Sequence, residues 1–324
     1  MNKRIVFLGT PEFAAAVLKR LHSTEQEVIA CVTQPDKPVG RHMKLTAPPA
    51  KVMALSLGIP VYQPASLRTE EFLAQMKAWT PDLVITAAYG KILPAAVLAV
   101  PVQGCLNVHA SLLPKYRGAA PVQWAILNGD KVTGITIMVM DAGMDTGDIL
   151  SQRECPIDPD EDTVALMARL ADIGAEFLVE TLPGYLSGSI KPVPQDDSLV
   201  TLSPPIQKEQ GLIDWTLPSD MIHNQIRALC GWPGAYTLYN GERFKIYGSR
   251  LPENADELIE GYKGDYGTPV PGTIIRGVKS GIYVACGTGC IVLTNVQPQS
   301  NRRMHVTECG HNYRAGTRFD GEIK

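Results

Sequence analysis

The sequence predicts an α/β domain, with a mostly parallel sheet covered by helices on both faces, followed by a small all-β domain. Apolar runs of strand length alternate with helical segments through the first 190 residues. Residues 191–207 are rich in Pro, Asp and Ser without periodicity, which is typical of a linker. Short β-rich runs separated by turn residues follow. At 324 residues the chain is also long enough to favour two domains.

The first domain opens on a β-branched run that ends at Gly9. Thr10 can cap the helix that follows, and Pro11 suits its first turn. A long polar loop at 34–51 comes after the second strand. We expect strands at 3–8, 27–33, 81–89, 104–110 and 134–141, and helices at 11–21, 50–58 and 163–184. This alternation predicts a Rossmann-like sheet.

The second domain has the turn chemistry of an all-β fold. Asn240-Gly241 lies between two β-rich runs and marks a tight hairpin. Further strands are expected at 272–278, 281–287 and 290–298, after a short helix at 223–230. The pattern predicts a small OB-like barrel. The predicted organisation is therefore one domain at 1–190, a linker at 191–207 and a second domain at 208–324.

Composition excludes several classes of protein. With 45% hydrophobic residues, 19% charged residues and a net charge of −3, the chain reads as globular and shows no global attraction to nucleic acid or membrane. No window approaches the roughly 18 apolar residues of a membrane span. Seven scattered cysteines without a Cys-x-x-Cys pair favour reduced thiols and a cytoplasmic location. No long apolar stretch is left over, so we expect a monomer.

One group of side chains could bind a metal. Cys286, Cys290, Cys309 and His311 supply a possible set of zinc ligands. In the alternative interpretation, the first two thiols only flank the turn of a hairpin. We favour that alternative and expect no metal.

The stretch NVHASLLPKYRGAAPVQW, residues 107–124, carries the candidate chemistry. Asn107 and His109 fall at the end of a predicted strand, where residues i and i+2 project from one face. The segment DAGMDTGD follows the next strand, and among its three aspartates we favour Asp145, between two glycines, as the partner of His109. A covalent route through Ser111 or Cys105 is less favoured, because neither has the sequence context of an activated nucleophile.

An amide, an imidazole and a carboxylate suit acyl transfer to an amine. The amide and a protonated imidazole can donate hydrogen bonds to the oxyanion of a tetrahedral intermediate. The carboxylate holds the imidazole in a useful charge state and helps to move the proton that the attacking ammonium loses. Alternatively, the residues are ordinary polar side chains at a strand end. Nicotinamide chemistry is disfavoured, because Gly9 stands alone where a dinucleotide fingerprint needs three glycines.

These residues also carry a family resemblance. LNVHASLLPKYRGAAPVQW, followed by MDAGMDTGDIL, resembles the formyltransferases that use 10-formyltetrahydrofolate. Within that group, QPDKPVGRHMKL, KEQGLIDW, GWPGAYT and QPQSNRRM are similar to the methionyl-tRNA formyltransferases. The resemblance covers essentially the whole chain. It implies that residues 1–190 form the catalytic domain and that the barrel at 208–324 binds tRNA.

The resemblance also assigns roles to individual residues. Asn107, His109 and Asp145 match the catalytic trio. The folate-contacting stretch is matched by Ser111, Leu112, Leu113 and Pro114, and contacts to tRNA are expected from Arg41, Lys44, Lys208, Arg302 and Arg303. Two features depart from the family pattern: His42 stands where the loop usually has a glycine, and 252–271 is an acidic segment without an assigned place.

The expected activity is formyl transfer from 10-formyltetrahydrofolate to the α-amino group of methionine on initiator tRNA, for translation initiation. Residues 208–324 carry 13 Lys and Arg against 12 Asp and Glu, so any tRNA contact must come from local basic clusters. Two alternatives remain open: an enzyme that keeps the donor but uses a small amine or water as acceptor, and a non-catalytic tRNA- or folate-binding protein.

Overall fold

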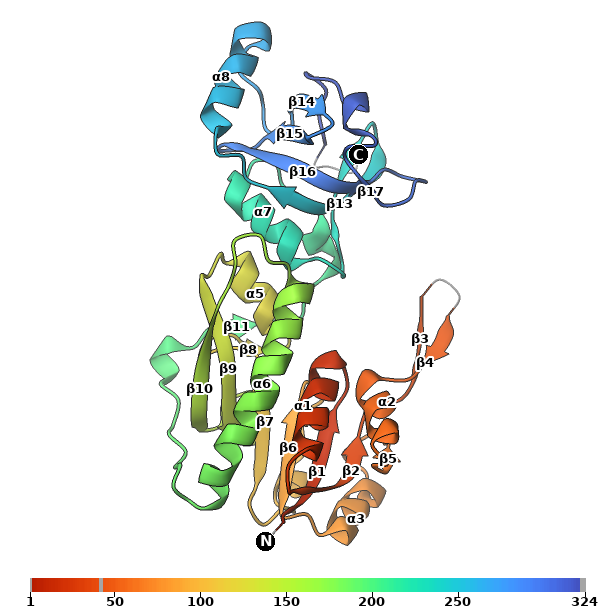
Figure 1. The fold of residues 1–324 in the computed structure, drawn as a ribbon, viewed down its shortest axis with the longest axis vertical. Coiled ribbons are helices and arrows are strands. Elements are labelled where there is room, and N and C mark those ends of the chain that lie inside the picture. The colour runs from red at the N-terminus through yellow and green to blue at the C-terminus, as the bar shows by residue number, and fades with distance from the viewer. Residues whose placement is uncertain (1, 41–42, 321–324) are drawn as a thin grey trace. The chain divides into compact units, whose positions relative to one another are not determined.

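The computed structural model describes residues 2–40 and 43–320. Its chain divides into two compact units. The first comprises residues up to 121, 132–156 and 166–204, and the second comprises 122–131, 157–165 and the residues from 205 onward. Both predicted fold types are confirmed: a mostly parallel sheet with helices in the first unit and an antiparallel β-sheet in the second (Figure 1). The boundaries predicted at 190 and 207 stay a prediction.

The first unit is built on a seven-stranded sheet in the order β10-β9-β7-β6-β1-β2-β5. These strands are β1 (Arg4–Gly9), β2 (Glu27–Val32), β5 (Val61–Tyr62), β6 (Leu83–Ala87), β7 (Cys105–His109), β9 (Val132–Val139) and β10 (Ile149–Pro156). The helices are α1 (Glu12–His22), α2 (Pro49–Ser56), α3 (Glu70–Trp79), α4 (Ala95–Leu98), α5 (Pro121–Leu127) and α6 (Thr163–Leu186). Most residues of α5 are assigned to the second unit, as are the first three of α6. All neighbours pair in parallel except β9, which runs antiparallel to both β7 and β10.

Both faces of this sheet are covered, because its central strands are mostly apolar and buried. In β1, Val6 and Leu8 join a cluster with Phe72 and Met76 of α3. On the other face α6 comes so close to the sheet that a methyl group added at Gly174 would meet Val108 and Ile135. Figure 1 shows α1 and α6 on the same side of the sheet. Parallel strands buried on both faces are expected to read as continuous apolar runs, as these do.

Two short pairings flank the main sheet. β3 (Lys37–Val39) and β4 (Lys44–Thr46) form an antiparallel hairpin within the stretch expected to be a loop. β8 (Arg117–Gly118) pairs in parallel with β11 (Leu202–Ser203). The second pairing draws much of the predicted linker against the first unit. That segment also contains a 3-10 helix, Asp197–Leu199.

The second unit holds a sheet in the order β12-β13-β16-β15-β14, with β17 paired to β16. Its elements are β12 (Ala235–Tyr239), β13 (Glu242–Arg250), β14 (Ile274–Val278), β15 (Gly281–Ala285), β16 (Cys290–Gln297), β17 (Met304–His305), α7 (Ser219–Ala228), α8 (Ala255–Tyr266) and the 3-10 helices Lys208–Gly211 and Gly310–Asn312. The predicted hairpin is confirmed, since Asn240 and Gly241 turn with positive φ between paired strands.

The acidic segment 252–271 finds a place in this unit. It forms α8, whose Tyr262 packs against Ile275 and Val292 of the sheet. At the end of the described chain, Asp320 exchanges backbone hydrogen bonds with Leu238 of β12, while Phe319 N donates to the carbonyl of Gly272, just before β14. One segment thus contacts both edges of the sheet. Closure into an OB-like barrel stays a prediction.

Of the helices in residues 2–40 and 43–320, none is both long enough and apolar enough to cross a membrane.

Candidate active site

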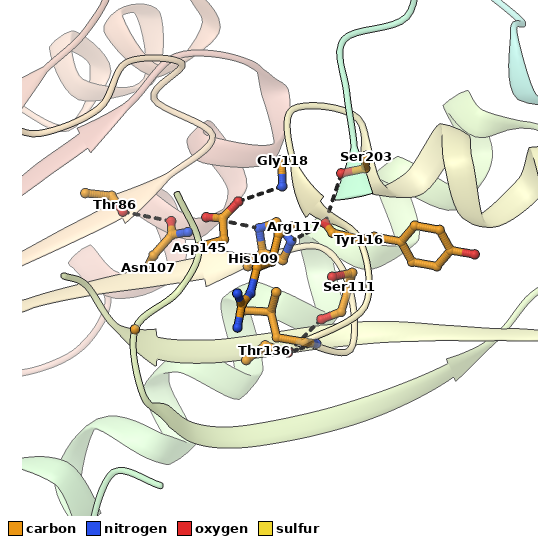
Figure 2. A network of polar contacts seen from close by, with 12 residues as sticks. Thr86, Asn107, His109, Ser111, Tyr116, Arg117, Gly118, Thr136, Asp145 and Ser203 are labelled. Atoms are coloured by element: carbon orange, nitrogen blue, oxygen red, sulfur yellow. Dashed lines mark hydrogen bonds and ion pairs between the residues drawn. The ribbon is translucent and has the colours of Figure 1, made fainter. Parts of the chain in front are cut away.

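Asn107 is held in β7 with a defined amide orientation. Its neighbours across the sheet are Thr86 in β6 and Met138 in β9. The hydroxyl of Thr86 donates to Asn107 Oδ1 at 2.7 Å. Because a carboxamide has one oxygen and one nitrogen, this hydrogen bond turns Nδ2 away from Thr86 and toward Asp145 (Figure 2). Asn107 therefore presents its N–H groups beside the other two predicted catalytic side chains.

His109 lies two residues further along β7 and projects from the same face. It is buried, and its Nε2 lies 3.1 Å from the carbonyl oxygen of Tyr116. A carbonyl can only accept, so Nε2 carries the proton that is donated to it. The hydroxyl of Ser203 donates to the same carbonyl at 2.9 Å, which holds the acceptor in place (Figure 2). The other ring nitrogen, Nδ1, is the one that faces Asp145.

Asp145 reaches His109 from a loop that begins at the opposite end of β7. β9 runs antiparallel to β7, so the 140–148 loop leaves the sheet near Cys105, whose carbonyl accepts from Met140 N, rather than beyond His109. The loop then folds back, and Asp145 Oδ1 lies 3.7 Å from His109 Nδ1. Its other carboxylate oxygen accepts from Gly118 N at 2.9 Å. The predicted trio is thereby brought together, although its roles stay a prediction.

The trio lines a cavity of about 400 Å³. That volume lies within the range of roughly 300–1,000 Å³ found for small-molecule sites. Most of the wall is apolar, and its lining includes residues that sequence reasoning missed: the loop of residues 88–93 after β6, Phe13 of α1, Met138, Met140 and Met144. The loop could have been anticipated, because it follows a parallel strand at the same sheet edge as His109. The methionines carried no comparable signal.

One lining residue has unused hydrogen-bonding capacity. The side chain of Tyr89 is 3% exposed, and its hydroxyl has no hydrogen-bond partner among the residues that the structure describes. Burial raises the pKa of this hydroxyl to about 12, so it stays a neutral donor. A buried polar atom without a partner is unfavourable, and this one is covered by protein atoms because Tyr89 packs in the cluster with Phe72 and Val97.

The predicted folate contacts lie beside this cavity and are not part of its lining. Ser111 is fully buried, and its hydroxyl donates to the carbonyl of Lys115. Its own carbonyl accepts from Thr136, whose hydroxyl oxygen in turn accepts from Leu113 N. These hydrogen bonds hold the stretch 111–114 in a defined conformation between β7 and Tyr116. Folate contact by Ser111, Leu112, Leu113 and Pro114 stays a prediction.

The predicted tRNA contacts are exposed where they are described. Lys44 begins β4, and Lys208 begins a 3-10 helix of the second unit. Arg302 pairs with Glu308, and the guanidinium of Arg303 lies 4.5 Å from the ring centre of Tyr247. Arg41 and the unusual His42 lie outside the described residues. The positive charge of the 34–51 stretch is also partly neutralised, since Lys51 is ion-paired with Asp36 at 2.8 Å.

Burial disfavours the thiolate form of three of the cysteines that the sequence singles out. Cys286 and Cys290 lie in separate hydrophobic clusters, and burial raises their pKa to about 12 and about 11. Cys105 is raised to about 12 for the same reason. Zinc binding and nucleophilic attack both need the thiolate, which burial disfavours. Within residues 2–40 and 43–320, no three His, Cys, Asp or Glu side chains are placed to hold a metal ion.

Solved structures share the fold at low sequence identity. HypX from Aquifex aeolicus, in complex with tetrahydrofolic acid, superposes with a TM-score of 0.64 at 16% identity, covering 95% of this chain and 47% of that one. An N-formyltransferase from Helicobacter canadensis, in complex with folinic acid and dTDP-3-aminofucose, gives 0.63 at 17% identity, covering 92% and 100%. At such identities the likeness concerns the fold alone.

Sequence relatives are more informative. Residues 3–182 match the formyl transferase family, and residues 205–314 match the formyl transferase C-terminal domain. The chain is 48% identical over 316 residues to a methionyl-tRNA formyltransferase of Trichlorobacter lovleyi, covering 97% of this chain and 96% of that protein. It is 45% identical over 318 residues to the one of Geobacter sulfurreducens, covering 98% and 96%. The chain therefore belongs to the methionyl-tRNA formyltransferase family of formyl transferases.

Proposed function

We propose that this enzyme transfers the formyl group of 10-formyltetrahydrofolate to the α-amino group of methionine on initiator tRNA. The observation that carries the proposal is the convergence of Asn107, His109 and Asp145 on the rim of one cavity. Membership of the methionyl-tRNA formyltransferase family supports both the donor and the acceptor. No enzyme nucleophile is needed, because the amine of the acceptor attacks the formyl carbon itself.

The geometry suggests a division of labour for the trio. Attack turns the formyl oxygen into an oxyanion, which Asn107 Nδ2 and a protonated His109 Nδ1 can stabilise by donating hydrogen bonds. Asp145, 3.7 Å from Nδ1, places a carboxylate beside the ring and can stabilise the positive charge that the ring carries during transfer. The bond between the formyl carbon and N10 then breaks, and the proton lost by the attacking ammonium ends on N10. A protonated His109 can give its Nδ1 proton to N10 as that bond breaks and then take up the proton that the attacking nitrogen loses, because its Nε2–H is committed to Tyr116 and only Nδ1 exchanges protons with the site.

The cavity suits a folate donor. A pterin has a flat apolar ring system with polar edges, and this cavity joins a mostly apolar wall to the polar side chains of the trio. The loop 88–93, Met138 of β9, and Met140 and Met144 of the loop that follows would enclose the ring. The stretch 111–114 would act from beside the cavity, either by contacting the rest of the donor or by supporting His109.

Contacts to tRNA are proposed at Lys44, Lys208, Arg302 and Arg303, with Arg41 as a further candidate. The four described side chains are exposed and cationic, as backbone phosphates require. Lys208→Ala should weaken tRNA retention to a similar extent for different tRNA sequences and reduce the salt dependence of binding by about one unit of slope. Retention measured between low and moderate salt checks this, and an unchanged slope would remove Lys208 from the interface.

A transfer assay tests the function. The protein is incubated with donor labelled in the formyl group and with methionyl-initiator tRNA, uncharged tRNA or an amino-sugar nucleotide in separate reactions. The proposal requires acid-stable label on methionine and none on uncharged tRNA. Label only on the sugar, release of labelled formate alone, or tRNA retention without transfer would each replace it with one of the alternatives.

We further propose that the enzyme acts as a monomer in the cytoplasm, as expected for a protein that acts on newly charged tRNA. Light scattering at micromolar concentration should give a mass near the 35.2 kDa of one chain, and cell fractionation should recover the protein away from membranes.

A further inference from the structure

The loop that carries Asp145 is attached to a side chain far away in the sequence. Gln195, in the segment that precedes β11, donates from Nε2 to the carbonyl oxygens of Asp145 and Gly147, at 2.8 and 2.7 Å. Its Oε1 accepts from both Nε and Nη2 of Arg117, at 3.0 and 2.9 Å. All the polar atoms of this amide are therefore engaged within the first unit.

Arg117 is itself fixed. Its side chain is buried, and Nη2 also donates to the exposed carboxylate of Asp197 at 2.8 Å. It follows Tyr116, whose carbonyl accepts from His109, and it precedes Gly118, whose N–H donates to Asp145. Gln195 thus links the backbone that carries the carboxylate to the segment that orients the imidazole.

Asp145 needs such support because of its backbone. Its φ is +55°, a left-handed conformation that is uncommon for residues other than glycine, although Asp adopts it more readily than most. The carboxylate has one direct backbone donor, Gly118 N, and its distance from His109 exceeds that of a hydrogen bond. A small movement of the loop would therefore change the separation of Asp145 and His109 without disturbing the sheet.

We propose that Gln195 is a positioning residue for catalysis, which holds the 145–147 backbone so that the Asp145 carboxylate faces His109. The inference rests on the proposed function. It adds that the segment between α6 and β11 supplies a side chain that positions a catalytic carboxylate. Gln195 touches no reacting atom, so its effect passes through Asp145.

The decisive variant is Gln195→Glu, which keeps the size of the side chain and the acceptor for Arg117. It replaces the amide N–H groups with an oxygen that faces two carbonyl oxygens, and so it repels the loop. We expect kcat for formyl transfer to fall about 10- to 100-fold while KM for donor and tRNA changes little, as for a misplaced catalytic group. An unchanged kcat would overturn the inference.

A matched control separates this role from a general loss of stability. Gln225 also donates from Nε2 to two carbonyls, those of Gln210 and Leu212, but it lies in the second unit. Gln195→Leu and Gln225→Leu each remove two hydrogen bonds donated to backbone carbonyls, and Gln195→Leu also removes the two that Oε1 accepts from Arg117. The first should lower kcat and the second should not, while both lower the melting temperature. Equal losses of kcat would show that only folding is affected.

A double-mutant cycle gives the sharpest readout. In single-turnover reactions with excess enzyme, Gln195→Glu should change the rate less than about twofold in an Asp145→Ala background, because no carboxylate remains to be positioned. If the rate losses of Gln195→Glu and Asp145→Ala multiply in the double variant, Gln195 acts independently of Asp145 and the inference is overturned. If the unaltered protein transfers no formyl group at all, the proposed function fails; if it is active and Gln195→Glu is equally active, only this inference fails.

Discussion

The amide of Asn107 offers a test in which the order of two variants matters. Thr86 donates to Asn107 Oδ1, so the N–H groups of the amide face the cavity and the oxygen faces the sheet. Asn107→Ala removes a donor from the oxyanion, and loss of one such donor costs about 10²–10³ in kcat, or about 2.7–4 kcal/mol. Asn107→Asp removes the same donor and places an oxygen where the nitrogen was.

Asn107→Asp should therefore have a lower kcat than Asn107→Ala. Thr86 can still donate to one carboxylate oxygen, which leaves the other directed at the oxyanion and at Asp145. Two like charges about 4 Å apart repel by about 4 kcal/mol at an effective dielectric constant of about 20. Protonation of the new carboxyl relieves part of this repulsion. We expect kcat for Asn107→Asp to lie at least about tenfold below that for Asn107→Ala.

Single-turnover transfer from labelled donor to methionyl-initiator tRNA measures both rates, and filter retention of tRNA serves as the control for folding and binding. Thr86→Val supplies a milder comparison, because the amide keeps its donor but loses the hydrogen bond that orients it. An aspartate variant as fast as the alanine variant would refute the amide orientation and, with it, the proposed role of Asn107.

Three further predictions concern the neighbourhood of the site and the protein's acid stability. His109→Ala should lower kcat by orders of magnitude and leave tRNA retention nearly intact, so near-normal turnover would exclude His109 from the chemistry. Gly118→Ala places a methyl group 2.6 Å from the carbonyl oxygen of Ser203, at a residue whose φ is +131°. Urea unfolding should therefore show a free energy of unfolding lower by about 1–3 kcal/mol, and an unchanged midpoint would contradict the close approach of residues 118 and 203. The hydrogen bond from Lys51 lowers the pKa of Asp36 in the folded protein. The ion pair therefore stabilises the fold fully above about pH 4, the ordinary pKa of an aspartate in the unfolded chain, and this stabilisation is lost as the pH falls through the lower pKa of the folded state. Asp36→Asn should accordingly lower the melting temperature at neutral pH and make it less dependent on pH in acid, whereas parallel melting curves for the two proteins would argue against this ion pair.

Local patterns predicted a large part of this protein. The period-two alternation of a strand places Asn107 and His109 on one face wherever that strand lies in the sheet. Apolar runs of strand length between helices predicted a mostly parallel sheet, and Asn240-Gly241 predicted a hairpin, because such features depend on neighbours in the sequence. The small hairpin at 37–46 was missed, since its two short strands have little apolar signal. The helix at 255–266 was missed because its many acidic residues obscured the few apolar residues that pack against the sheet.

The sequence by itself determined the fold and singled out the three side chains that meet at the cavity, because strand periodicity, turn residues and family motifs are properties of short stretches of chain. Tertiary structure alone decided how the site is assembled. An apolar run reads the same in either direction, so the antiparallel course of β9 and the return of Asp145 toward His109 could not be read from it. The hydrogen bond from Gln195 to Asp145 joins residues 50 positions apart. Such contacts depend on how the whole chain closes on itself.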